Sequence, residues 1–194
     1  MTPTSVVVGL AIVFGLSWMA AGLWARQTVV RMPDRYQLPL YGAALAAVLL
    51  LFVAKSLFPA LLIRLWEEYA LFDWAMTAVC AIAFAWCWWA RLHLGNLWSA
   101  GVSRKEGHRV VDTGPYGIVR HPIYTGAILA MFTFAAVRGR PIDLLFALFV
   151  AVFFSLKARL EERFLRQEFG SAYDTYSRRV ARLVPFLRLW ASSE

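Results

Sequence analysis

The chain has 194 residues, of which 60% are hydrophobic and 16% are charged, and its formal net charge is +8. Soluble domains carry roughly a quarter charged residues and about 45–50% apolar ones, so this composition indicates a membrane protein small enough for one domain. In so apolar a chain, the basic excess is typical of cytoplasmic loops facing anionic lipid head groups. We therefore expect contact with membrane lipids and no nucleic-acid partner.

Five apolar segments predict an all-α integral membrane protein, a single domain with five transmembrane helices, of which the last two form a tight hairpin. The predicted spans cover residues of about 4–25, 38–58, 72–91, 122–137 and 141–157. The first segment lacks a basic start, and its apolar run exceeds the 7–15 residues of a signal peptide. We expect it to be retained as a span.

The Lys and Arg residues divide unequally between the two sides that these five spans define. When Lys55, Arg91 and Lys157 at the span ends are counted with the loops that they adjoin, sixteen fall in the loops after the first and third spans and in the C-terminal segment, and four fall on the other side. The positive-inside rule then places the N-terminus outside and the C-terminus in the cytoplasm. We expect a location in a prokaryotic inner membrane. The loop 93–121 and the C-terminal segment 158–194 would share the cytoplasmic side and could form one site.

Cys80 and Cys87 are the only cysteines, and both lie in the third apolar segment. Two thiols on one helix within lipid favour a packing role over a disulfide. Because no Cys-x-x-Cys or Cys/His cluster accompanies them, we expect no metal site.

The polar loop before the fourth span carries candidate binding residues. Gly114 allows a ligand to approach the backbone closely, and Pro122 suits the first turn of a helix. His121 would then lie at the helix start, where backbone donors and the helix dipole favour an anionic group. Arg120 adds a cation beside it. The pattern indicates a polar ligand held at the membrane surface.

The C-terminal segment continues the fifth span as a polar helix that contains Glu161 and Glu162. On charge pattern alone, these form a solvated turn in which Glu162 pairs with Arg166 four residues on. Neighbouring residues point about 100° apart on a helix, so the sequence leaves open which glutamate faces a pocket. A second short helix is expected after Gly170, with Tyr173 and Tyr176 on one face.

Several motifs in this half of the chain occur together in a specific order. They are 94–99 (LGNLWS), 113–116 (TGPY), 120–126 (RHPIYTG), 161–162 (EE) and 168–170 (EFG), followed by Tyr173 and Tyr176. Over roughly 93–185, their order and spacing resemble the isoprenylcysteine carboxyl methyltransferase family and its phospholipid methyltransferase relatives.

The resemblance implies methyl transfer from S-adenosyl-L-methionine to a membrane-embedded acceptor, with the carboxylate of an isoprenylated cysteine-like substrate as the first expectation. It also implies a cytoplasmic cofactor pocket built from the loop before the fourth helix and the C-terminal helical segment. The catalytic residues would be His121, Arg120 and Glu161. The cofactor-binding residues would be His108, Val111, Gly114, Tyr116, His121, Pro122, Tyr124, Glu161 and Glu162. The lipid-like or prenylated acceptor would enter sideways from the bilayer.

Three other interpretations stay open at this point. The protein could methylate a phospholipid amine, reduce a sterol-type substrate with NADPH, or act as a non-enzymatic membrane scaffold. An ionised carboxylate acceptor needs no general base, whereas a neutral amine or hydroxyl would need one, such as His121 or a glutamate.

Overall fold

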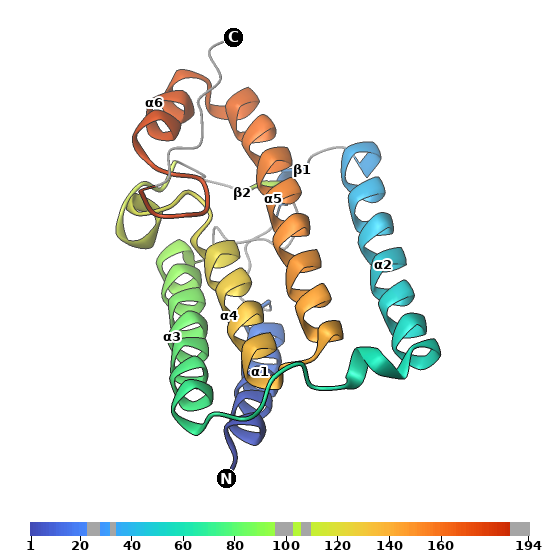
Figure 1. Cartoon of the computed structure of the whole chain (residues 1–194). Helices are drawn as coiled ribbons and strands as arrows, with labels where there is room; N and C mark the ends of the chain where they lie inside the picture. The colour runs from blue at the N-terminus through green and yellow to red at the C-terminus, as the bar shows by residue number, and fades with distance from the viewer. Residues whose placement is uncertain (23–27, 32–33, 96–102, 106–109, 187–194) are drawn as a thin grey trace.

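The structure is a computed structural model that describes residues 1–22, 28–31, 34–95, 103–105 and 110–186. Its described residues form an α-helical bundle with one short strand pair (Figure 1). The helices are α1 (Pro3–Ala21), α2 (Asp34–Leu57), α3 (Ala70–Leu94), α4 (Pro122–Arg138), α5 (Pro141–Phe169) and α6 (Ser171–Arg179). Two 3-10 turns, η2 (Pro59–Leu62) and η4 (Gly114–Gly117), complete the helical elements.

Four helices (α1, α2, α3 and α5) are long and apolar enough to cross a membrane, and α4 is a shorter apolar helix. A span needs about 20 apolar residues, so α4, with 17 residues, lies at the lower limit. The expectation of an all-helical membrane protein is confirmed at this level. The strands β1 (Thr28–Arg31) and β2 (Ser103–Lys105) pair antiparallel, a feature that the apolar pattern of the sequence does not predict.

The helix ends follow from local sequence. The Thr2 hydroxyl accepts a hydrogen bond from the Ser5 amide at 3.2 Å, which caps α1. Both α4 and α5 begin at a proline, whose fixed φ suits the first helical position. The turn between them contains Gly139 at φ +64°, and its carbonyl accepts from the Leu65 amide at 2.8 Å. The chain between α2 and α3 is therefore fastened to the α4–α5 turn.

The core lies where α3 meets α4, with α1 packed against both (Figure 1). Phe14 of α1 stacks on Phe84 of α3, with ring centroids 4.2 Å apart. Gly126 of α4 allows the closest approach, because a Cβ atom there would lie 2.5 Å from the Sγ of Cys87. Cys80 and Cys87 are buried free thiols in this contact.

Helix α2 stands at the edge of the bundle and packs against α5 (Figure 1). In the described residues 35–57, the most apolar stretch of α2 contains no buried residue. Large apolar side chains such as Leu45, Leu49 and Phe52 are more than half exposed. Such a surface is expected where lipid covers a helix.

Candidate functional site

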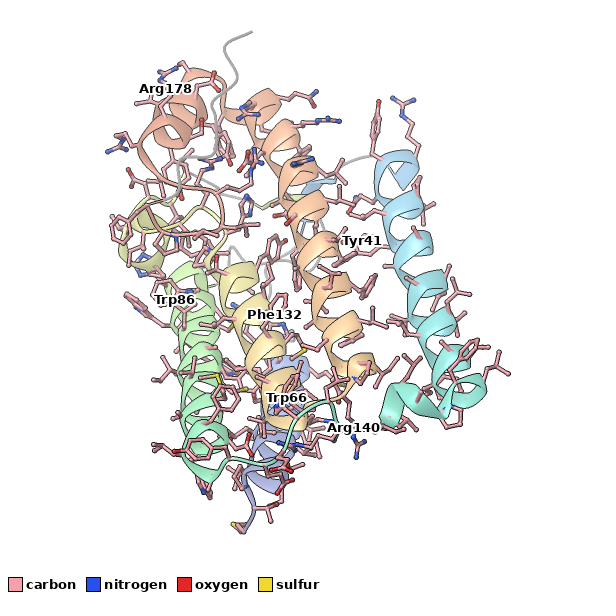
Figure 2. The ribbon with its side chains drawn as sticks, in the orientation of Figure 1. Tyr41, Trp66, Trp86, Phe132, Arg140 and Arg178 are labelled. Carbon is pink, nitrogen blue, oxygen red and sulfur yellow. The ribbon has the colours of Figure 1, made fainter. Side chains whose placement is uncertain are left out.

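The polar end of the bundle lies opposite the N-terminus and gathers α6, the η4 loop and the C-terminal part of α5 (Figure 1). Figure 2 shows Arg178 of α6 at this end and Arg140 at the opposite end. The loop 110–121 and the segment after α6 thus meet at one end of the bundle, beside α5.

The loop before α4 turns at η4, next to the end of α3. Gly114 has φ +57°, and a Cβ atom there would lie 2.7 Å from Cε1 of His93, so both conformation and space favour glycine. His93 Nε2 lies 3.0 Å from the Thr113 hydroxyl. The carbonyl of Tyr116 accepts a hydrogen bond from the Tyr176 hydroxyl at 2.7 Å, which ties the loop to α6. Val111 is half-buried just before this turn.

The segment after α6 runs alongside the entry to α4. Val119 and Ala181 form a parallel bridge. The amide of Arg120 donates to the Ala181 carbonyl at 2.8 Å, and the amide of His121 donates to the Arg182 carbonyl at 3.1 Å. These two amides lie just before α4, and their bonds join the entry of α4 to the segment after α6. We call the paired segments 119–125 and 176–183 the clasp.

Glu162 of α5 is the centre of the clasp. Its side chain is 1% exposed and accepts hydrogen bonds from Arg120 and Arg182. Arg120 donates through Nε and Nη2 at 2.9 and 2.8 Å. Arg182 donates through the same two nitrogens at 3.0 and 2.9 Å, and Arg166 adds a longer ion pair of 3.7 Å. The predicted Glu162–Arg166 pair therefore exists, but as one part of a buried network.

Arg120 is committed to this network. Its Nη1 atom donates to the carbonyls of Ser177 and Val180, in addition to the two bonds with Glu162. Its side chain is only 9% exposed. The guanidinium therefore joins the α4 entry, α5 and the segment after α6.

Glu161 has different surroundings. Its side chain is 17% exposed and accepts a hydrogen bond from the Tyr124 hydroxyl at 2.6 Å. His121 lies between the two glutamates, with Nδ1 3.4 Å from Glu161 and Nε2 3.3 Å from Glu162. The His121 ring also stacks on Tyr124 at a centroid distance of 5.3 Å, and Tyr124 stacks in turn on Phe154.

The two carboxylates set the protonation of His121. Burial alone would lower its pKa, but hydrogen bonds and charge attraction from Glu161 and Glu162 outweigh burial and raise the pKa above its usual value. The imidazolium form is thus favoured at neutral pH more than in a free histidine.

Most of the predicted site residues come together at this end of the bundle. Tyr116 is buried, and Glu161 is close enough that its charge adds to the effect of burial in raising the pKa of the Tyr116 phenol. Pro122 is buried at the start of α4, and its carbonyl accepts from the Trp86 indole at 2.8 Å. The predicted residue His108 and most of the motif 94–99 lie outside the described residues.

Three further side chains at this site were not predicted as functional. The Thr125 hydroxyl donates to the Leu183 carbonyl at 2.6 Å, and Arg182 binds Glu162. Lys157 lies four residues before Glu161, on the same helix face, and is 8% exposed. The sequence could have indicated Lys157, because residues four apart lie on the same helix face and Lys157 precedes Glu161 by four residues.

These features define a class: a helical membrane protein with a buried, charged site at one end of its bundle. Residues 75–167 match the model of the isoprenylcysteine carboxyl methyltransferase family, which confirms the resemblance predicted from the sequence. The match begins within α3 and ends within α5, so α1 and α2 lie outside it.

Similar curated proteins include Protein-S-isoprenylcysteine O-methyltransferase B of Arabidopsis thaliana, 37% identical over 44% of this chain and 44% of that protein. Methanethiol S-methyltransferase 2 of Bradyrhizobium diazoefficiens is 43% identical over 37% of this chain and 27% of that protein. The matched part of the chain thus spans less than half the length of these relatives.

A solved structure of the eukaryotic intramembrane Ras methyltransferase, an isoprenylcysteine carboxyl methyltransferase, has the same fold. The TM-score is 0.57 at 24% identity, over 76% of this chain and 53% of that one.

Proposed function

We propose that this protein transfers a methyl group from S-adenosyl-L-methionine to a membrane-embedded acceptor, the carboxylate of an isoprenylated cysteine-like substrate. The family match over residues 75–167 and the isoprenylcysteine methyltransferases among its relatives support this. The observation that carries the proposal is the difference between the surroundings of the two glutamates. Glu162 is enclosed by the clasp, whereas Glu161 is partly exposed beside Tyr124 and His121.

The residues at this end fit the chemistry of the proposed methyl donor. S-adenosyl-L-methionine carries a cationic amino group and ribose hydroxyls, and a partly exposed carboxylate such as Glu161 can accept hydrogen bonds from both. The half-buried Val111 offers apolar surface for an adenine. When bound, the donor supplies a methyl group on a positively charged sulfur. We assign Arg120 and Glu162 to positioning, because they hold the clasp together.

The transfer needs no proton to move when the acceptor is a carboxylate. An acceptor oxygen gives an electron pair to the methyl carbon, the carbon–sulfur bond breaks, and its electron pair stays on the sulfur. The charge of the acceptor and that of the sulfonium both disappear. Alignment of the two partners then supplies most of the catalysis. In this scheme His121 orients Glu161 and is not a general base.

We also propose that the polar end faces the cytoplasm, because 16 of the 20 Lys and Arg residues fall on that side of the predicted spans. The donor would then reach the site from the cytoplasm. The acceptor tail is most stable in the bilayer, so the acceptor would reach the site from the side.

The test is methyl transfer by the purified protein in lipid nanodiscs, with a radiolabelled donor and three acceptors. They are a farnesylated cysteine analogue, phosphatidylethanolamine and a free isoprenoid acid. Label in a base-labile ester of the farnesylated analogue is the expected result. Label in the phospholipid alone would replace the proposal with the amine methyltransferase alternative. Absence of label in every acceptor, from protein that is folded by its thermal transition, would reject methyl transfer to this class of substrate.

A further inference from the structure

We infer that Lys157 receives the anionic group of the acceptor and that Tyr41 of α2 forms the wall beside it. This inference rests on the proposed methyl transfer and names the residues that would select an acceptor with an apolar tail and an anionic end. It also places acceptor selection partly on α2, outside the segment that matches the family model.

Lys157 lies between two aromatic rings from different helices. Its ammonium nitrogen is 5.6 Å from the ring centroid of Tyr41 on α2 and 5.4 Å from that of Tyr124 on α4. An ammonium within about 6 Å of a ring face is attracted by the ring quadrupole, so the rings hold the charge in place. Figure 2 shows Tyr41 between α2 and α5.

The depth of Lys157 suits the head group of a lipid-like molecule. At 1.5 Å per residue, Lys157 lies about 24 Å along α5 from Pro141, close to the roughly 30 Å of bilayer hydrocarbon. The apolar stretch of α5 thus ends near this lysine. A tail lying along the exposed apolar surface of α2 would bring its polar end to the same level.

Lys157 lies near a different carboxylate from the other cations at this end of the bundle. Arg120, Arg166 and Arg182 all contact the buried carboxylate of Glu162. Lys157 is instead on the Glu161 face of α5 and is near enough to favour the ionised form of Glu161 by charge attraction. Its position over the ring of Tyr41 also places it against α2.

A fixed ammonium selects the charge of the acceptor. It attracts a carboxylate, and it lowers the pKa of a nearby thiol toward the thiolate. It repels the ammonium head of a phospholipid amine. The acceptor oxygen or sulfur gives its electron pair to the methyl carbon, and the bond between that carbon and the donor sulfur breaks with its electron pair left on the donor sulfur. A carboxylate is already ionised and releases no proton, whereas a thiol first gives its proton to water and then reacts as the thiolate. The inference therefore covers carboxylates and thiols and excludes amines.

The experiment measures binding of N-acetyl-S-farnesylcysteine and its methyl ester by calorimetry, in detergent and without methyl donor. The acid and the ester differ in one negative charge. We expect the wild-type protein to bind the acid about tenfold tighter than the ester or more. Lys157→Met should weaken acid binding about tenfold and leave ester binding unchanged, whereas Lys157→Arg should keep most of the preference.

Lys55→Met is the matched control. Lys55 is also a lysine over an aromatic ring on an apolar helix, 4.1 Å from the centroid of Phe52, but it lies near the other end of α2. In Lys55→Met, the ratio of the affinity for the acid to the affinity for the ester should equal that of the wild type. An unchanged ratio in Lys157→Met would overturn the inference. A wild-type ratio near one would also overturn it, even if the Lys157→Met variant fails to fold.

Two further measurements separate this inference from the proposed function. If the protein neither binds S-adenosyl-homocysteine nor methylates any acceptor, the methyltransferase proposal is rejected. The ratio of acid affinity to ester affinity would still decide whether Lys157 binds the anionic group. In transfer assays, a farnesylated acid and a long-chain alkanethiol show whether the acceptor is a carboxylate or a thiol. Methylation of either compound should depend on Lys157. Methylation of phosphatidylethanolamine by the wild-type protein that is lost in Lys157→Met would contradict the selection of anions.

Discussion

Arg182 lies after α6 and donates two hydrogen bonds to Glu162 of α5, from Nε at 3.0 Å and from Nη2 at 2.9 Å. Twenty residues separate the two side chains in sequence, and α6 lies between them. The carboxylate of Glu162 also accepts two bonds from Arg120 at the entry to α4. One buried carboxylate therefore joins three parts of the site, and its neighbour Glu161 is left facing Tyr124.

The two glutamates should respond differently to removal of their charge. Glu162→Gln leaves the buried guanidinium of Arg120 without its anion, and breaking such a pair costs about 3 kcal/mol or more. Glu161→Gln should change stability little and weaken binding of S-adenosyl-homocysteine at least about tenfold. Thermal unfolding and calorimetry on both variants check this.

Glu68→Gln is the control for loss of an ion pair. Glu68 pairs with Arg64 near the opposite end of the bundle, and its side chain is 69% exposed, so its loss should cost less than about 0.5 kcal/mol. Equal destabilisation by the Glu161 and Glu162 variants would contradict the division of roles.

Two tyrosines of α6 form a matched pair for testing the clasp. Tyr176→Phe removes the hydrogen bond to the Tyr116 carbonyl and should cost about 1 kcal/mol. Among the described residues, the buried hydroxyl of Tyr173 has no hydrogen-bond partner, so Tyr173→Phe should be neutral or slightly stabilising. Thermal unfolding of the two variants, with limited proteolysis of the C-terminal segment, makes the comparison. A reversed order of stability would show that Tyr176 does not hold the loop.

Stability should depend on pH through His121. Its pKa is higher in the folded protein than in the unfolded chain, so the folded state binds the proton more tightly. The resulting stabilisation is complete below the unfolded value of about 6.5 and is lost as pH rises through the raised folded value. The melting temperature of the wild type should fall over that window. The slope should be smaller in His121→Gln, and an equal slope in both proteins would assign the effect to other groups.

The α3–α4 contact should not tolerate a methyl group at Gly126. A Cβ atom there would meet the Sγ of Cys87 at 2.5 Å and the Ala83 carbonyl oxygen at 3.0 Å, so Gly126→Ala should destabilise the protein by about 1–3 kcal/mol. Gly42→Ala is the control, because nothing lies within 4 Å of its added methyl. It should leave the melting temperature unchanged or raise it slightly. Equal melting temperatures for the two variants would contradict the close packing.

Much of the helical architecture could be predicted because lipid imposes a simple rule: backbone polar groups must be satisfied within a helix. Runs of uncharged apolar residues therefore indicated where helices lie, and prolines at 122 and 141 indicated where two of them begin. The pairing of β1 with β2 gave no such signal, because the strands have four and three residues and lie about seventy residues apart.

The site could be predicted only as a set of residues. Helical spacing placed Glu161 and Glu162 near the membrane boundary but could not rank them, because their roles depend on Arg182 and on the clasp, which are distant in sequence. The preference for an anion at the start of α4 is sound local chemistry. The amides of Arg120 and His121, which precede that start, bind the carbonyls of Ala181 and Arg182, and this pairing is also distant in sequence.

Methyl transfer from S-adenosyl-L-methionine is tested most directly by the binding of S-adenosyl-homocysteine, compared with NADPH, to the purified protein by calorimetry. We expect saturable binding of one S-adenosyl-homocysteine per chain and no heat from NADPH. Binding of NADPH without S-adenosyl-homocysteine, or binding of neither by folded protein, would contradict it.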